Sequence, residues 1–186
     1  MRAVALVVGL LMATPLVAAA APISGSDLMP VMRHLGMDGI GRATSESLIG
    51  FTPGLKALDG AQRACAAGEL ARLLDAHMST QIAGTFGEEG SDLLAEWTRF
   101  MPTPAGVDMG RTFRASAQVQ AGIATATPQV SAAHKEAIAA FMQGEAFQRF
   151  IGGLSAESPV PEDIGERMAE ALKSGCQIDF DPGQMS

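Results

Sequence analysis

The sequence predicts an all-α protein, a single-domain helical bundle that follows an N-terminal signal peptide. Apolar residues recur at intervals of three and four through most of the chain, whereas the period-two alternation that indicates strands is missing. About 165 of the 186 residues follow the leader, which is the usual size of one domain and enough to build a core. No repeat, low-complexity linker or second composition regime divides them.

The leader, "MRAVALVVGLLMATPLVAAAA", has the order of a secretory signal peptide: a basic residue, an apolar run and a string of alanines. Cleavage after Ala19 or Ala20 fits, and we favour Ala20, so residues 1–20 form the signal peptide and residues 21–186 the all-helical domain. An uncleaved anchor is the alternative, but Pro15 leaves an apolar run shorter than the roughly 20 residues of a spanning helix. No later segment could span a membrane, so a periplasmic or secreted domain is expected.

The charge balance excludes one class of partner. Arg2 is the one charged side chain of the leader, so the domain carries 12 basic and 20 acidic side chains, a net charge of −8. Such a charge repels phosphate backbones and anionic lipid surfaces. Nucleic acid is therefore not expected as a partner.

Cys65 and Cys176 are the two cysteines of the chain. After export they would meet an oxidising compartment, where an even pair is normally bridged, so we predict a disulfide between them. A reactive thiol is the alternative. It needs a Cys-x-x-Cys motif or an electropositive setting, and Cys65 has only Arg63 nearby, followed by Glu69.

Two helical patterns open the domain. Ser26 can cap a helix that ends at Gly36, with Pro30 tolerated in its first turn. The following segment, "MDGIGRATSESLIGF", contains several glycines and is assigned as a second helix.

The longest helical pattern opens at Thr52 and Pro53 and runs to Phe86, which predicts a central helix. Gly60 and Gly68 each cost about 1 kcal/mol relative to alanine inside a helix. Either a neighbour packs closely at these glycines, or the helix is broken there.

Two further patterns follow the central one. Ser91 is expected to cap a helix that ends near Met101, before Pro102 and Pro104. Residues 106–123 form the next helical pattern, which ends before Pro128.

Residues 136–153, "EAIAAFMQGEAFQRFIGG", follow a capping Ser131 and contain two apolar groups that face opposite ways on one straight helix. Either the chain turns at residues 143–145 into a hairpin over a shared core, or one helix is packed on two sides. Gly144 favours the turn, because glycine readily adopts the left-handed conformation that ends helices. Phe141 and Phe150 are therefore interpreted as core residues and not as a ligand platform.

The last helical pattern has Pro161 and two acids at its start, Lys173 near its end and Gly175 as its stop. Cys176 follows directly. A bridge to Cys65 would tie this helix to the central one.

The hairpin segment "AIAAFMQGEAFQRFIGGL" resembles a family of small secreted bacterial all-helical domains of unknown function, which carry an F-Y-x-S-P-x-G-x-K-like segment between two helices. Phe141 and Met142 match the F-Y pair, Gly144 stands where that family turns, and Arg149 lies near its basic position. The usual proline is Glu145 here, and the usual glycine lies near Phe147. The resemblance implies an all-helical fold without known catalysis and supplies no site residue.

Motifs for chemistry are absent from the sequence. The histidines, His34, His77 and His134, have no metal-binding spacing, and there is no G-x-S-x-G elbow, P-loop or dinucleotide-binding glycine pattern. His77 lies on the apolar side of the central helix, where a hydrogen-bonded core histidine is favoured over a general base.

Two clusters have a functional and a structural interpretation. The residues Met29, Met32, His34 and Met37 suit Cu(I), but the methionine spacing also suits core filling, which we favour. The acids Glu88, Glu89 and Asp92 lack the alternating spacing of a calcium loop and are interpreted as stabilising a helix start.

Two functions remain open. The leading hypothesis is a non-enzymatic domain that binds a protein partner or a small apolar ligand between its helices. The alternative is an enzyme of unrecognised type that uses a cleft with Cys65, His77 or carboxylates. A pocket with two or more titratable groups would favour the enzyme, and a packed core with one exposed apolar patch the binding domain. No catalytic, metal-ligating or cofactor-binding residue is assigned, and no cofactor is expected.

Overall fold

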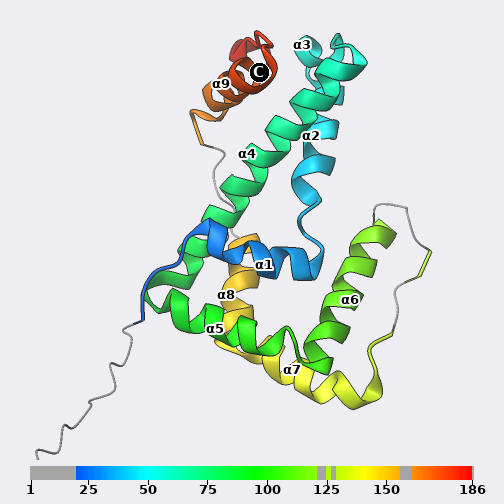
Figure 1. The fold of residues 1–186 in the computed structure, drawn as a ribbon, viewed down its shortest axis with the longest axis vertical. Coiled ribbons are helices and arrows are strands. Elements are labelled where there is room, and N and C mark those ends of the chain that lie inside the picture. Colours follow the sequence, from blue (N-terminus) through cyan, green and yellow to red (C-terminus); the bar gives the residue numbers. More distant parts are fainter. Residues whose placement is uncertain (1–19, 121–124, 127–128, 156–160, 186) are drawn as a thin grey trace, which may run out of the picture.

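The computed structural model describes residues 20–120, 125–126, 129–155 and 161–185, and within these ranges the chain forms helices and no strand. The longest helix, α4 (Gly60–Phe86), is the axis of the molecule (Figure 1). Helices α2 (Ile40–Phe51) and α9 (Ile164–Cys176) pack on its first half, and α1 (Gly25–Leu35) and α8 (Glu145–Ser155) on its second half. The predicted all-α, single-domain bundle is confirmed.

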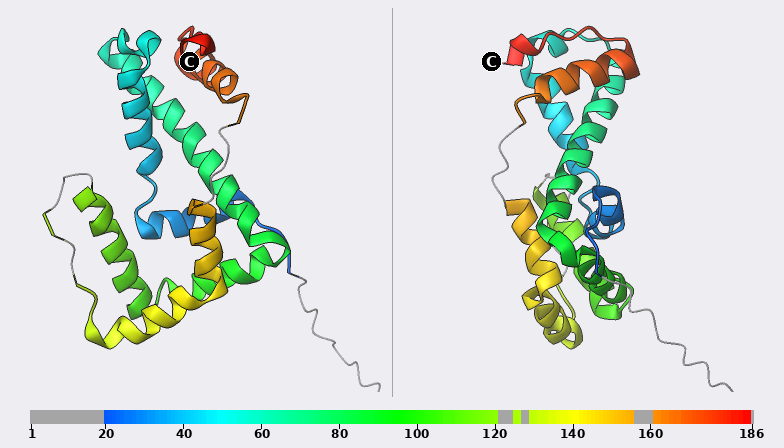
Figure 2. Two further views of the ribbon diagram at one scale, coloured as in Figure 1. Left: turned by 180° about the vertical axis from the view of Figure 1, so that it is seen from behind. Right: turned by 90° about the vertical axis from the view of Figure 1, so that its left-hand side faces the viewer.

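The remaining helices lie around the two ends of α4. The short α3 (Pro53–Lys56) lies at the start of α4, and α5 (Gly90–Phe100) and α7 (Lys135–Gln143) lie beyond its other end, whereas α6 (Pro104–Gln120) stands to the side and packs on α1 (Figure 1). The views in Figure 2 show α4 connecting these two ends of the molecule. Among the described helices, none is both long and apolar enough to cross a bilayer.

Two hydrophobic cores lie along α4. The larger core surrounds Trp97, which is fully buried and donates its indole N–H to the Ala146 carbonyl oxygen over 3.1 Å. It is built from α1, the second half of α4 and helices α5 to α8. The smaller core lies at the other end and contains Ile49, Leu55, Ala66, Ala67, Leu70, Met168, Leu172, Ile178 and Phe180.

Helix α1 begins two residues earlier than predicted. Its N-cap is Ser24 and not Ser26, and Asp27 accepts a hydrogen bond from the Ser24 backbone N–H over 2.9 Å. Pro30 lies inside the helix and not in its first turn. Gly36 ends the helix as predicted, with φ of 75°, a conformation that glycine adopts without steric cost.

The predicted central helix is interrupted. The helical conformation is interrupted between α3 and α4. Asp59 caps α4 by accepting a hydrogen bond from the Gln62 backbone N–H over 2.8 Å. The break explains Gly60, which is the first residue of α4. Neither a broken helix nor a closely packed neighbour accounts for Gly68. Helix α4 continues through it, and a Cβ there would meet nothing within 4 Å.

Two predicted helix boundaries near the second end of α4 are wrong. Ser91 is not a cap, because Glu89 is the N-cap residue of α5. The Ser91 hydroxyl instead accepts the Ala21 backbone N–H over 2.9 Å, which holds the start of the domain on α5. The predicted end of α5 before Pro104 is confirmed, but α6 begins at Pro104, a position at which proline is favoured, and not at residue 106. The predicted end of the next helix, residues 121–123, and the leader up to residue 19 lie outside the described residues.

The hairpin is confirmed: α7 and α8 meet at Gly144 and pack on one shared core. Its turn differs from the prediction, because Gly144 has φ of −70° and ψ of 155°, an extended and not a left-handed conformation. Phe150 is fully buried. Phe141 is half-buried, stacks on Phe100 with ring centroids 3.8 Å apart, and contacts Trp97 edge-on.

The predicted disulfide is confirmed. Cys65 in α4 is bonded to Cys176 in the last turn of α9, and their Cα atoms are 5.8 Å apart. Helix α9 begins later than expected, at Ile164, and continues through Gly175. Its stop is Gln177, which takes the left-handed conformation with φ of 58°.

Candidate functional site

The methionine cluster belongs to the larger core. Met32 is fully buried, and Met29 and Met37 pack on the same core. The ring Nε2 of His34 lies 2.8 Å from the Gly106 carbonyl oxygen, which joins α1 to α6. No group of three or more His, Cys, Asp or Glu side chains that could hold a metal ion occurs within the described ranges.

The residues named for a catalytic alternative are not brought together. Cys65 is bonded to Cys176, so its sulfur is not a free nucleophile. His77 is half-buried, lines a hollow of about 180 Å³ beside Asp75, and makes no hydrogen bond to any residue that the structure describes. The expected hydrogen-bonded core position of His77 is therefore wrong.

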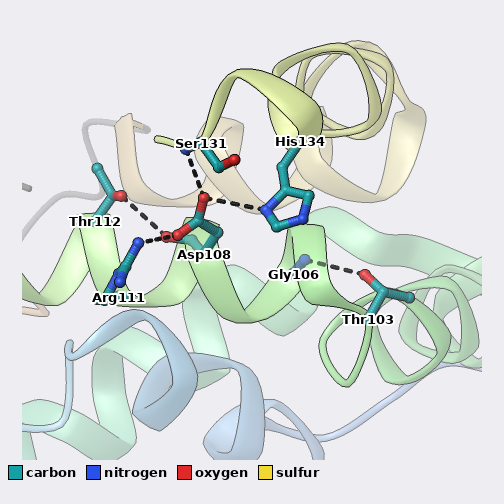
Figure 3. Close-up of polar contacts among 7 residues, drawn as sticks. All are labelled: Thr103, Gly106, Asp108, Arg111, Thr112, Ser131 and His134. Atoms are coloured by element: carbon teal, nitrogen blue, oxygen red, sulfur yellow. Dashed lines mark hydrogen bonds and ion pairs between the residues drawn. The ribbon is translucent and has the colours of Figure 1, made fainter. Parts of the chain in front are cut away.

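A polar cluster that the sequence did not reveal is centred on Asp108 of α6 (Figure 3). This carboxylate is 6% exposed, accepts the Ser131 backbone N–H over 2.8 Å, forms an ion pair with Arg111, and lies 3.2 Å from His134 Nδ1. The hydrogen bond from Ser131 lowers the pKa of Asp108 most, and burial opposes it. The hydrogen bond with His134 and the positive charge of Arg111 lower this pKa further, so it stays below its usual value.

The Asp108 cluster has the residue types of a Ser-His-Asp triad but a different geometry. Ser131 contributes its backbone N–H to the carboxylate, and no hydrogen bond joins its hydroxyl to His134. In a triad, the histidine lies between the serine hydroxyl and the carboxylate. The arrangement instead holds the turn before α7 against α6, and we call it the Asp108 clamp.

The candidate site for a ligand is an open hollow of about 390 Å³ between the α1–α2 junction, α6 and the end of α8, called the apolar hollow below. Ile40, at its rim, is 41% exposed. Most of the lining is apolar: Leu35, Met37, Ile40, Phe113, Ala117, Phe150, Ile151 and Leu154, together with Gly36, Thr112 and Ser116.

Close packing of α1 on α6 determines the position of the apolar hollow. A Cβ on Gly36 would lie 3.0 Å from the Arg114 Cα, and a Cβ on Gly110 would lie 2.8 Å from the His34 carbonyl oxygen, so both contacts need glycine. Further along the same face of α6 stand Ser116 and Ala117. Their short side chains leave space between α6 and α8.

A second hollow of about 400 Å³, whose lining includes charged side chains, adjoins the apolar hollow and is called the polar extension below. The two share Gly36, Ile40 and Ala117, and the polar extension adds Asp38, Gly39, Ala43, Arg114 and Gln118. One Nη of Arg114 donates to the His34 carbonyl oxygen, which fixes the guanidinium at this wall.

No family model, curated protein or solved structure matches this chain. The resemblance of the α7–α8 segment to the secreted helical family therefore stays a prediction, and no role is taken from it.

A third region, the charged groove, lies between α1, α2 and α4 and measures about 670 Å³. Its walls include Asp38, Arg42, Arg72 and Asp75. Burial raises the pKa of Asp75, the nearby charge of Asp38 adds to this effect, and a hydrogen bond from the Gly41 backbone N–H over 3.1 Å opposes it. By the criterion of two titratable groups in one pocket, this groove favours the enzyme alternative.

The sequence reveals neither the apolar hollow nor the polar extension, because each is lined by segments that are far apart in the chain. Leu35 and Leu154 face the same space although more than one hundred residues separate them. In the helical patterns, such residues are indistinguishable from ordinary core positions. Ile40 is the one local signal, since it begins a helix next to glycine and polar neighbours.

Proposed function

We propose that this chain is an exported, non-enzymatic helical domain that binds a small apolar ligand in the apolar hollow. The observation that carries the proposal is an open space of about 390 Å³, within the usual range of ligand pockets, with mostly apolar walls. Without a ligand, water covers the apolar walls of this space. A ligand that displaces this water gains about 25 cal/mol of binding free energy per Å² of apolar surface that it covers. The concave shape supports a small ligand over the protein partner that the sequence left open.

Export rests on two independent features. The leader has the order of a signal peptide, and the Cys65–Cys176 disulfide is of the kind that persists in oxidising compartments. Both support a periplasmic or secreted domain.

The binding proposal is tested by filling the hollow. Ala117 is exposed and lines the space, so Ala117→Trp blocks it without disturbing a core position. The control is Ala139→Trp, the same substitution at an exposed position of α7 outside this lining. Titration with the neutral fluorescent probe N-phenyl-1-naphthylamine should show saturable binding to wild type and Ala139→Trp, and at least tenfold weaker binding to Ala117→Trp. Equal binding to all three proteins, or none to wild type, would refute the proposal.

The charged groove supports the enzyme alternative, because a carboxyl with a raised pKa in a cleft is a candidate proton donor. Asp75 would be that donor. Hydrolysis of a chromogenic ester, amide or glycoside by wild type, lost in Asp75→Asn with an unchanged melting temperature, would favour the enzyme over the binding domain.

A further inference from the structure

We infer that the ligand is a free alkyl carboxylate, with its chain in the apolar hollow and its carboxylate on Arg114 in the polar extension. This inference rests on the proposed function and adds the chemical class of the ligand. The two spaces share Gly36, Ile40 and Ala117, so one molecule can occupy both. Their walls differ in chemistry, since one is mostly apolar and the other carries charged side chains. A ligand with one apolar and one ionic end matches that difference.

Arg114 is the cation of the polar extension and selects an anionic end. Its guanidinium has five N–H donors, and the contact with His34 uses one Nη, so donors remain for a carboxylate. The same contact holds the guanidinium in place, which lowers the entropic cost of binding. Arginine recognises carboxylates through two parallel hydrogen bonds, a geometry that lysine does not reproduce.

Asp38 also lines the polar extension and opposes an anion. It is exposed, so solvent and salt weaken its repulsion, whereas Arg114 is half-buried and interacts more strongly. Removing the two charges should therefore change the affinity for a carboxylate in opposite directions. Loss of the Arg114 charge weakens binding, and loss of the Asp38 charge strengthens it.

The volume of the apolar hollow limits the length of the chain. A methylene group fills roughly the volume of one water molecule, about 30 Å³, so a hollow of about 390 Å³ holds on the order of ten carbons. Each methylene that enters should tighten binding by about fourfold, and the gain should stop once the hollow is full. Decanoate is therefore the probe of choice.

The experiment measures calorimetric affinities of decanoate, decanol and decylammonium, each below its aggregation threshold, for the full domain. Decanoate should bind wild type at least tenfold more tightly than decanol. Arg114→Gln should remove this preference, and saturable binding of decanol to this variant shows that the hollow is still present. Arg114→Lys should keep part of the preference, Asp38→Asn should increase it, and Arg99→Gln, an exposed control on α5, should not change it.

The outcomes separate this inference from the proposed function. Equal affinity for decanoate and decanol, both lost in Ala117→Trp, would overturn the role of Arg114 and leave the apolar hollow as the binding site. Tighter binding of decylammonium would assign the head group to Asp38 and also overturn it. Absence of binding by all three probes would refute the proposed function itself.

Discussion

At the scale of single residues, the Asp108 carboxylate joins two parts of the chain. It belongs to α6, accepts the Ser131 backbone N–H and lies beside His134, which precedes α7. Its 6% exposure means that these partners replace water as its hydrogen-bonding environment. The clamp therefore fixes the path by which the chain returns from α6 to the hairpin.

Asp108→Asn should lower the stability of the domain at neutral pH. The folded-state pKa of Asp108 is depressed, so its ionised form stabilises the fold above the unfolded pKa of about 3.9, and this contribution is lost as the pH falls through the lower folded pKa. The difference in melting temperature between wild type and Asp108→Asn should be largest near pH 7 and should shrink towards pH 2. Glu46→Gln, at an exposed site in the middle of α2, is the control. A constant difference across this range would contradict the prediction.

Gln177 is a residue at which the fold carries backbone strain. It ends α9 with φ of 58°, a conformation that costs a non-glycine residue about 1–2 kcal/mol, part of which glycine would lose again through its freer unfolded chain. Gln177→Gly should therefore stabilise the domain by about 0.5–1 kcal/mol. Urea unfolding checks this value, with Gln177→Ala expected to remain near wild type. A destabilised glycine variant would show that the side chain matters more than the backbone.

At the scale of elements, the α7–α8 hairpin shows why two of its phenylalanines differ in burial. Phe150 is fully buried beside Trp97, whereas Phe141 lies at the edge of the core, stacked on Phe100. The sequence pattern places both on apolar helix faces, but it does not show which face reaches the centre.

Phe150→Ala should destabilise the domain by about 3–5 kcal/mol, a large part of the usual stability of a domain. Phe141→Ala should cost about 1–2 kcal/mol, because the lost ring is only partly buried. The fluorescence of Trp97, the single tryptophan of the chain, reports unfolding of this core directly. Wild-type melting temperatures for both variants would mean that the rings serve a ligand instead of the fold.

At the scale of the whole molecule, the disulfide links α9 to α4 across 111 residues. In the chain-entropy account, a loop of this length contributes at most about 4–5 kcal/mol, because the bridge restricts the unfolded chain. Reduction, or the pair Cys65→Ser and Cys176→Ser, should lower the urea midpoint accordingly. Thiol titration of the denatured, unreduced protein should detect no free thiol. Two free thiols in freshly exported protein would contradict the bridge.

Export predicts a defined start of the mature chain. Cleavage after Ala20 would leave Ala21 at the N-terminus, and the Ser91 hydroxyl accepts the Ala21 N–H in the folded domain. Intact mass of protein from the periplasm or medium should correspond to residues 21–186. Retention of the full-length chain in a membrane fraction would refute cleavage.

The comparison of sequence and structure separates local from distant information. The helix stop at Gly36, the hairpin around Gly144 and a helix within residues 37–51, observed from Ile40, follow from patterns within one or two turns. The disulfide follows because two cysteines allow only one pairing. Ser91 shows the limit, since its hydroxyl serves Ala21 and not its own helix. The Asp108 clamp and the apolar hollow were not predicted, because their members meet only after the helices have packed.

The two cores along α4 also describe how the molecule can open. Each core is a separate set of contacts, so hydrogen exchange should reveal two cooperative units of different stability that share one helix. Helix α2 starts at Ile40, on the rim of the apolar hollow, and reaches the smaller core through Ile49. A ligand bound in the apolar hollow should therefore slow amide exchange in both units. The slower exchange should be measurable even in the smaller core, next to the disulfide.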